Sequence, residues 1–269
     1  MPPDFVTRFA PSPTGPLHLG HAYSAILAHD MARAAGGKFL LRIEDIDRVR
    51  CKPEFEAAIY DDLAWLGLAW ETPVLRQSHH FLRYDAALDL LGMHGLTYPC
   101  QCSRADIRAA LSAPQEGVAE EPYPGTCRHR TMDQRQPTDA VRLRLNGETV
   151  RFRETGPDHA GEITVRLGSG DPVVGRRDID TVAYVLACVV DDAAQGVTHI
   201  VRGMDLSDFT GVQVHLQGLL GLATPVYHHH HLIRDETGKR LAKRDNARAL
   251  AKYRAVGATP ADIRAMVGL

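Results

Sequence analysis

Short apolar runs alternate with longer segments of helical periodicity along the first third of the chain. Apolar side chains dominate residues 5–10 and 38–45, which predicts two strands. Apolar residues recur every three or four positions over 17–35, 53–67 and 79–94, which predicts three helices, and glycine follows or closes each one. Strands that alternate with helices are typical of βαβ units, so the pattern predicts a parallel sheet.

The middle of the chain has a different pattern. Residues 97–130 carry three of the five cysteines and a linker rich in Pro, Glu and Gly. Apolar residues then alternate with arginine over residues 140–154, on either side of Asn146-Gly147. Asn-Gly between alternating runs is a strong hairpin signal. We therefore expect a hairpin here, within a segment inserted into an α/β domain.

The α/β pattern returns after Gly175. Residues 181–203 predict a buried apolar segment, a turn and a strand, and residues 208–221 predict a helix. Residues 225–233 predict a further strand that contains four histidines, His228–His231. We expect that strand to be partly exposed, with one histidine facing a site.

The composition is ordinary for a soluble globular protein, at 44% hydrophobic and 24% charged residues over 269 positions. No apolar run approaches the roughly 20 residues that cross a bilayer, and the N-terminus lacks the pattern of a signal peptide. The expected localisation is cytoplasmic, with no membrane partner, and the expected state is a monomer.

The charge is uneven along the chain, although the net charge is only −2. Between Arg234 and Arg254 there are eight Lys or Arg residues against three acidic ones. Part of this segment, "TGKRLAKRDN", contains Lys243 in a glycine-containing loop. Such a loop suits a phosphate group, whereas an exposed basic loop is the simpler explanation of the run by itself.

The stretch "RFAPSPTGPLHLGH", residues 8–21, joins the first predicted strand to the first predicted helix. A helix N-terminus at the carboxyl edge of a parallel sheet attracts phosphates. His18 and His21 fall on one side of the first turn, and Gly20 between them leaves room for a flat base. Phosphate ligands and incidental histidines both fit this spacing, while a metal site lacks further ligands.

This stretch is similar, nearly residue for residue, to the first signature of the glutamyl- and glutaminyl-tRNA synthetases. "LRIEDIDRVR", "VVDDAAQGVTHIVRGMDL" and "GKRLAKRD" follow in the order of that family's further blocks, so the resemblance covers residues 7–250. It implies an α/β fold with a Rossmann-like, doubly wound parallel sheet, an inserted zinc-containing subdomain like an acceptor-binding domain, and a helical C-terminal segment.

The resemblance also implies a division of the chain. Residues 1–98 and 175–235 would form the two halves of the catalytic domain, and residues 99–174 the inserted subdomain. Residues 236–269 would hold a KMSKS-like loop and the helical segment, with no anticodon-binding domain. Two features, the end of the sequence at Leu269 and the cysteine pattern described below, make the chain most similar to the short branch of glutamyl-Q tRNA(Asp) synthetases.

Members of that branch activate L-glutamate with ATP, accompanied by Mg²⁺, and transfer it to the queuosine base of tRNA(Asp). Two other functions stay open: charging of a tRNA 3′ end, and a tRNA-binding paralogue without activity. The motive for the inactive paralogue is the second signature, which has Arg240 and Ala242 where the family usually has Lys and Ser, although Lys243 is retained. A further departure is Ile179-Asp180, where an Asp-Gly pair is usual.

Carried over by motif, the resemblance assigns two sets of site residues. His18, Gly20, His21 and Lys243 would bind ATP, with the two histidines and Lys243 acting in catalysis. The glutamate site would comprise Arg8, Phe9, Ala10, Pro11, Ser12, Glu44, Tyr184 and Arg202. Arginine forks suit carboxylates and Glu44 suits an ammonium group. From spacing alone, Glu44 and Arg202 are better explained by structural ion pairing.

The cysteines form a third candidate site. Cys100, Cys102 and Cys127, with Tyr123, match the zinc pattern of the branch, in which a tyrosine oxygen is the fourth ligand. Three sulfurs and one further donor suit tetrahedral zinc, whereas without the resemblance three free thiols are about as good an explanation. The resemblance favours a structural Zn²⁺, and Cys51 and Cys188 are expected to be incidental.

Overall fold

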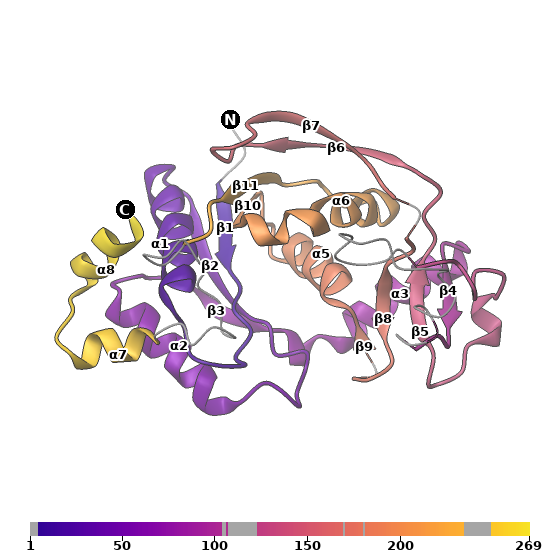
Figure 1. The fold of residues 1–269 in the computed structure, drawn as a ribbon, viewed down its shortest axis with the longest axis horizontal. Coiled ribbons are helices and arrows are strands. Elements are labelled where there is room, and N and C mark those ends of the chain that lie inside the picture. The colour runs from indigo at the N-terminus through magenta and orange to yellow at the C-terminus, as the bar shows by residue number, and fades with distance from the viewer. Residues whose placement is uncertain (1–4, 104–105, 107–122, 169, 180, 234–248) are drawn as a thin grey trace.

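A parallel sheet forms the centre of the computed structural model, which describes residues 5–103, 106, 123–168, 170–179, 181–233 and 249–269 (Figure 1). Three parallel strands run in the order β1-β2-β3: β1 (Val6–Phe9), β2 (Lys38–Ile43) and β3 (Glu71–Arg76). β10 (His199–Gly203) and β11 (Val226–His230) pair in parallel beyond them. The backbone N–H of Thr198 donates to the carbonyl of Val6 at 2.9 Å, so β10 lies beside β1.

The strand order therefore reverses between β1 and β10. The chain builds outward from β1 to β3 and later continues on the other side from β10 to β11. In open α/β sheets, ligands bind at the carboxyl ends of the strands at this reversal. The α/β class and the parallel sheet predicted from the sequence are confirmed.

The helices of the described chain have the bounds α1 (Leu19–Ala34), α2 (Pro53–Trp65), α3 (Phe81–Met93), α5 (Tyr184–Ala194), α6 (Thr210–Leu219), α7 (Leu250–Ala255) and α8 (Pro260–Val267). α1, α2, α3 and α6 occupy segments predicted as helices, α7 and α8 lie in the predicted helical C-terminal segment, and α5 forms where only a buried apolar segment was predicted. α1 buries small residues such as Ala22, Ala25 and Ala28, so its axis can lie close to the sheet. α7 and α8 lie at the left in Figure 1, and α8 packs on α1, where Arg264 pairs with Asp30 at 2.6 Å. None of the helices in the described ranges combines the length and the apolarity that a bilayer span needs.

The middle segment contributes to two different sheets. An antiparallel sheet has the order β4-β5-β8-β9, with β4 (Thr97–Cys100), β5 (Ala140–Leu143), β8 (Val173–Arg176) and β9 (Thr181–Val182). The expected boundaries at residues 98/99 and 174/175 thus fall inside β4 and β8. β6 (Thr149–Glu154) and β7 (Gly161–Arg166) form a hairpin that arches over the top of Figure 1.

The hairpin predicted around Asn146-Gly147 is wrong. Gly147 does turn the chain, with φ +79°, but β5 pairs with β4 and β8, while β6 pairs with β7 and, in parallel, with β11. The physical reason is burial: Val141 and Leu143 are fully buried in the core cluster that α3 and α5 share with the middle segment. A turn signal determines the local backbone, whereas the burial of whole faces selects the partner strands.

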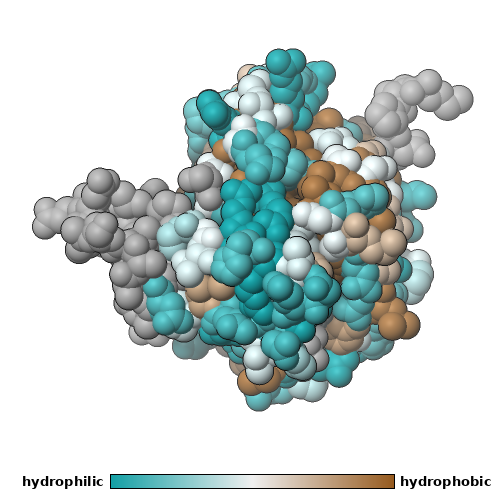
Figure 2. Space-filling view, turned by 90° about the vertical axis from the view of Figure 1, so that its right-hand side faces the viewer, coloured by the Kyte–Doolittle hydropathy of each residue, from teal (hydrophilic) through white to brown (hydrophobic). Residues whose placement is uncertain are grey.

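The end of the molecule that carries β4 and β5 presents a band of hydrophilic side chains with hydrophobic ones at its borders (Figure 2). Between β4 and β5 the described chain is mostly exposed and polar, including His129, Thr131, Gln134 and Arg135. This end therefore contrasts with the apolar interior of the parallel sheet.

Candidate functional site

A cavity of about 440 Å³ lies at the carboxyl ends of β1, β10 and β11, where the strand order reverses. Every predicted glutamate or ATP residue that the structure describes lines it: Arg8, Phe9, Ala10, Pro11, Ser12, His18, Gly20, His21, Glu44, Tyr184 and Arg202. Lys243 lies outside the described residues. The cavity size suits a small ligand.

The two histidines of the "HLGH" stretch begin α1. His18 is the N-cap and accepts the backbone N–H of Gly20 on Nδ1 at 3.1 Å, and His21 accepts the N–H of His18 on its own Nδ1 at 3.2 Å. In a neutral imidazole whose Nδ1 accepts, the proton is on Nε2. Both rings, 3.8 Å apart, therefore present an N–H donor, which is the property that phosphate oxygens require.

Gly20 leaves room for the ring of His18. A Cβ at this position would lie 3.1 Å from Cε1 of His18. The glycine thus lets the His18 ring fold back over the first turn, where its Nδ1 caps the helix.

Arg8, on β1, is held by an acidic partner that the motif did not reveal. Its Nε donates to Oδ1 of Asp192 at 2.8 Å and its Nη2 to Oδ2 at 3.3 Å. Arg42 donates to the same Oδ1 at 2.6 Å and to Oε1 of Glu44 at 3.1 Å. Asp192 and Arg42 are buried within the "VVDDAAQ" and "LRIED" blocks. The sequence could have indicated this ion network only through the presence of oppositely charged residues in separate signature blocks.

These contacts set the charges on this side of the cavity. Burial by itself raises the pKa of Asp192, but the guanidiniums of Arg42 and Arg8 outweigh it and lower the pKa to about 2. Burial raises the pKa of Glu44 against the opposing effect of Arg42 and Arg8. Asp192 is therefore ionised at neutral pH, and its charge offsets that of the two arginines.

Arg202, at the end of β10, has only neutral hydrogen-bond partners. Its Nη1 donates to Oε1 of Gln213 at 2.7 Å, its Nη2 to the hydroxyl of Thr210 at 2.8 Å and its Nε to Nε2 of His229 at 3.1 Å. Within the described part of the chain, no carboxylate lies within ion-pair distance of it. Ion pairing therefore explains Glu44, whose partner is Arg42, but not Arg202.

Tyr184 begins α5 and closes another wall of the cavity. Its ring packs edge-on against Phe209 at 5.7 Å between centroids. Burial raises the pKa of the Tyr184 hydroxyl well above its usual value. The group is therefore a neutral hydroxyl that can donate a hydrogen bond within the cavity.

The four consecutive histidines divide between different tasks. His228 contacts the hydroxyl of Thr155 at 3.1 Å, and His229 contacts Arg202. His230 contacts Ser24 of α1 at 2.8 Å, and both His230 and His231 line the cavity. The expectation of a single site-facing histidine is thus wrong, because β11 ends at the cavity edge and its last residue and the next both reach it.

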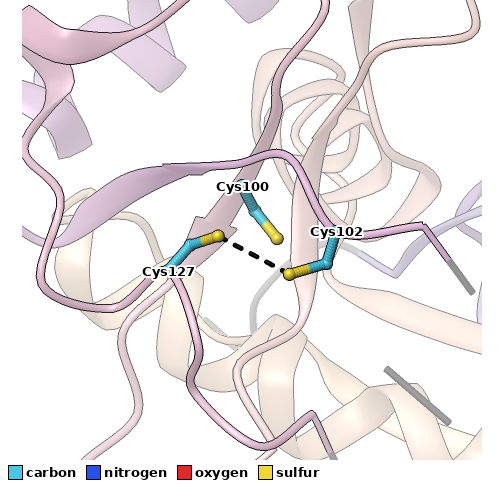
Figure 3. A group of neighbouring side chains, drawn as sticks. All are labelled: Cys100, Cys102 and Cys127. Carbon is cyan, nitrogen blue, oxygen red and sulfur yellow. Dashed lines mark hydrogen bonds between the residues drawn. The ribbon is translucent and has the colours of Figure 1, made fainter. Parts of the chain in front are cut away.

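The thiols of Cys100, Cys102 and Cys127 converge beneath the turn after β4 (Figure 3). Sγ of Cys102 lies 3.5 Å from Sγ of Cys127, and Oη of Tyr123 lies 3.4 and 3.7 Å from Sγ of Cys100 and Cys102. Zinc–sulfur and zinc–oxygen bond lengths imply tetrahedron edges of about 3.5–3.8 Å. The three distances given above are close to such edges, and the three sulfurs lie within 4.8 Å of one another, so the cluster is suited to a metal ion.

A cation accompanies this cluster. The Nε of Arg142, on β5, donates to Sγ of Cys100 at 3.3 Å, and its guanidinium lies 3.7 Å from the ring centre of Tyr123. Burial raises the pKa of Cys102 to about 11, so this group is a neutral thiol at neutral pH in the absence of a metal ion.

A model of the catalytic domain of class I tRNA synthetases (E and Q) matches residues 4–269. The chain belongs to this family. As a member of the class I synthetases, the protein is a ligase. The family match extends the resemblance drawn from the signature blocks to nearly the whole chain.

Two relatives of this class I synthetase carry the same name. It is 59% identical to the glutamyl-Q tRNA(Asp) synthetase of Rhodobacter capsulatus, over 98% of this chain and 100% of the relative. It is 44% identical to the glutamyl-Q tRNA(Asp) synthetase of Geobacter sulfurreducens, over 94% of this chain and 79% of that one.

Solved structures resemble the synthetase along its length. The glutamate-tRNA synthetase from Elizabethkingia anophelis matches 98% of this chain with a TM-score of 0.81 and 25% identity. A glutamate tRNA ligase from Elizabethkingia meningosepticum, in complex with its amino acid, matches with a TM-score of 0.80 and 25% identity. The chain spans 61% and 60% of the lengths of those two proteins.

The described residues that flank the second signature of the synthetase both lie at the site. Ile233 lines the cavity. Ala249 forms a β-bridge with His18, and the N–H of Leu250 donates to the carbonyl of Leu17 at 2.8 Å. Ile233 and Ala249, the described residues on either side of the segment that contains Lys243, thus both lie close to residues of the first signature.

Proposed function

We propose that the enzyme activates L-glutamate with ATP and transfers the glutamyl group to the queuosine base of tRNA(Asp). The observation that carries the amino-acid part is Arg202, a buried guanidinium at the cavity whose partners are all neutral. A buried cation of this kind favours an anionic ligand, and it rejects neutral analogues that leave its donors unpaired. The names of the two relatives support the glutamate and tRNA parts.

In the proposed reaction, the side-chain carboxylate of glutamate binds Arg202, and its ammonium group is held near Glu44. The α-carboxylate oxygen attacks the α-phosphorus of ATP, the bond to the β-phosphate oxygen breaks, and pyrophosphate leaves. His18 and His21 donate Nε2–H to phosphate oxygens, and Lys243 offsets the charge that develops on the α-phosphate. The protein then acts by positioning and charge stabilisation, and Mg²⁺ enters with ATP.

We further propose that Cys100, Cys102, Tyr123 and Cys127 hold a structural Zn²⁺. The donor set and its spacing suit zinc, which would hold β4 to the polar segment that precedes β5. The ion would hold the thiols as thiolates and would take no part in the transfer. A tRNA substrate favours a cytoplasmic location, and a monomer remains the expected state.

The second candidate function is charging of a tRNA 3′ end, which the likeness to two glutamate-tRNA synthetases favours. Transfer of labelled glutamate to tRNA(Asp) with and without queuosine separates the two. The proposal expects label only with queuosine, and label that survives removal of the 3′ adenosine. Equal labelling without queuosine, or loss of label with the 3′ adenosine, would favour charging of the 3′ end.

Glutamate-dependent pyrophosphate exchange tests the activation step and the third possibility, a tRNA-binding paralogue without activity. Exchange by the wild-type enzyme excludes that paralogue. Lys243→Ala should reduce exchange strongly if the lysine contacts the α-phosphate. Unchanged exchange in this variant would contradict the role proposed for Lys243.

A further inference from the structure

The guanidinium of Arg202 is oriented by a chain of contacts that ends in the middle segment of the protein. Its Nε donates to Nε2 of His229, and the hydroxyl of Thr210 lies 3.1 Å from the same nitrogen. Arg202 has no acceptor role, so Nε2 of His229 must be the acceptor. His229 therefore carries its proton on Nδ1 and is neutral in this arrangement.

Glu154 holds that tautomer. Its Oε2 lies 2.5 Å from Nδ1 of His229, and its Oε1 accepts the backbone N–H groups of Thr155, Gly156 and His229 at 3.0, 2.6 and 3.0 Å. Although burial by itself raises the pKa of Glu154, these hydrogen bonds outweigh it and lower the pKa to about 2. The carboxylate is ionised and buried, and its Oε2 contacts Nδ1 of the imidazole.

The backbone is shaped to allow this approach. β6 runs parallel to β11 at the pair Glu154 and Tyr227, which brings Glu154 beside His229. A Cβ on Gly156 would lie 2.3 Å from the carbonyl oxygen of His229 and 2.9 Å from Oε1 of Glu154. Only glycine therefore lets the chain after β6 come this close to β11.

We infer that Glu154 and His229 are a positioning pair for Arg202, through which the middle segment of the chain helps to orient the amino-acid pocket. The inference rests on the proposed binding of a substrate carboxylate to Arg202. The imidazole fixes the direction of the guanidinium by accepting its Nε–H, and it does not neutralise the positive charge of Arg202 as a directly bound carboxylate would. The negative charge of Glu154 stays one ring away, where it helps to offset the cost of burying Arg202. Each terminal nitrogen of Arg202 gives one N–H to Gln213 or Thr210 and keeps its second N–H for the substrate.

Two substitutions at position 229 separate the two contacts of the ring. An asparagine amide lies near the position of Nδ1, so His229→Asn retains a donor for Glu154 and loses the acceptor for Arg202. A glutamine amide reaches the position of Nε2, so His229→Gln retains an acceptor for Arg202. The control is His228→Asn, a neighbouring histidine that contacts Thr155 and does not line the cavity.

The readouts are the Kd of glutamate and the Kd of ATP from calorimetry, with pyrophosphate exchange measured in parallel. We expect His229→Asn to weaken glutamate binding on the order of tenfold, with ATP binding unchanged. His229→Gln should weaken glutamate binding less, and His228→Asn should match the wild type. A role in folding alone would instead affect both ligands equally, or would leave His229→Asn and His229→Gln indistinguishable, and either outcome overturns the inference.

The failure of the proposed function is recognised separately. Wild-type enzyme that binds glutamate but shows no pyrophosphate exchange contradicts glutamate activation, and the binding measurements then still test the positioning pair. Wild-type activity together with an unchanged glutamate Kd in His229→Asn overturns the positioning pair alone.

Discussion

Two arginines line the same cavity, but the protein surrounds them in opposite ways. Arg8 shares the ionised carboxylate of Asp192 with Arg42, so its charge is offset within the protein. Arg202 is held by an amide, a hydroxyl and an imidazole, and the carboxylate of Glu154 contacts the far side of that imidazole. The comparison teaches that two arginines of the same pocket can be held differently: one belongs to a buried ion network, and the other has only neutral hydrogen-bond partners among the described residues.

The largest expected effect comes from a substitution of Arg202, the arginine with neutral partners. Arg202→Gln removes a charge that substrate binding would use, so glutamate-dependent exchange should lose on the order of 10³-fold in kcat/KM, while thermal stability changes little. The measurement is pyrophosphate exchange beside a melting curve. Arg151→Gln is the matched control, since Arg151 is exposed on β6. Retained exchange in Arg202→Gln would show that Arg202 does not anchor the substrate.

The next largest effect is a loss of folding stability when the ion network of Arg8, Asp192 and Arg42 is broken. Asp192→Asn leaves two buried guanidiniums without their shared carboxylate, which costs about 3–5 kcal/mol, and Tm should fall by roughly 10 °C. The control is Asp178→Asn, because Asp178 pairs with Arg176 at the surface, with 61% of its side chain exposed. Equal melting temperatures for the two variants would mean that Asp192 contributes no more than an exposed ion pair.

A smaller effect is the dependence of stability on pH, to which Asp192 beside Arg8 and Glu154 beside His229 both contribute. The pKa values of Asp192 and Glu154 are both lowered to about 2, from the ordinary 3.8 and 4.5. A lowered carboxylate pKa stabilises the fold above the unfolded value, and that stability is lost as pH falls through the folded value. The free energy of unfolding, from urea titrations, should therefore decline between about pH 4.5 and pH 2.

The variants test which side causes that decline. Glu154→Gln and Asp192→Asn should each make the acid limb shallower than in the wild type. If the free energy of unfolding declined with falling pH as steeply in both variants as in the wild type, the acid sensitivity would belong to other carboxylates.

The smallest expected effect on catalysis lies in the cysteine cluster, which contacts neither arginine. Tyr123→Phe removes the proposed fourth zinc ligand, so a chelator should extract zinc faster, while glutamate activation changes by less than about twofold. Elemental analysis and chelator kinetics provide the measurement. Tyr98→Phe is the control, since the Tyr98 hydroxyl contacts Asp171 rather than the thiols. No zinc in freshly purified wild type would contradict the metal proposal.

Local patterns predicted much of the scaffold. Apolar periodicity located α1 to α3, α6 and the strands β1, β2, β10 and β11, because side-chain spacing follows directly from backbone geometry. It did not predict β3, and it gave only a buried apolar segment where α5 lies. The first three signature blocks located most of the predicted cavity residues, since each of these blocks contains the end of a strand at one sheet edge. The hairpin at Asn146-Gly147 failed, because strand pairing depends on which distant faces are buried together.

The sequence by itself determined the fold class, the family and the residues that line the cavity, since these follow from periodicity and from short motifs. Only the tertiary structure decided what the charged residues do. Asp192 lies 184 positions from Arg8, and Glu154 lies 75 positions from His229. Electrostatic and hydrogen-bond partners are chosen by distance in space, so the protein's division into one compensated and one uncompensated arginine arises when strands from distant parts of the chain meet.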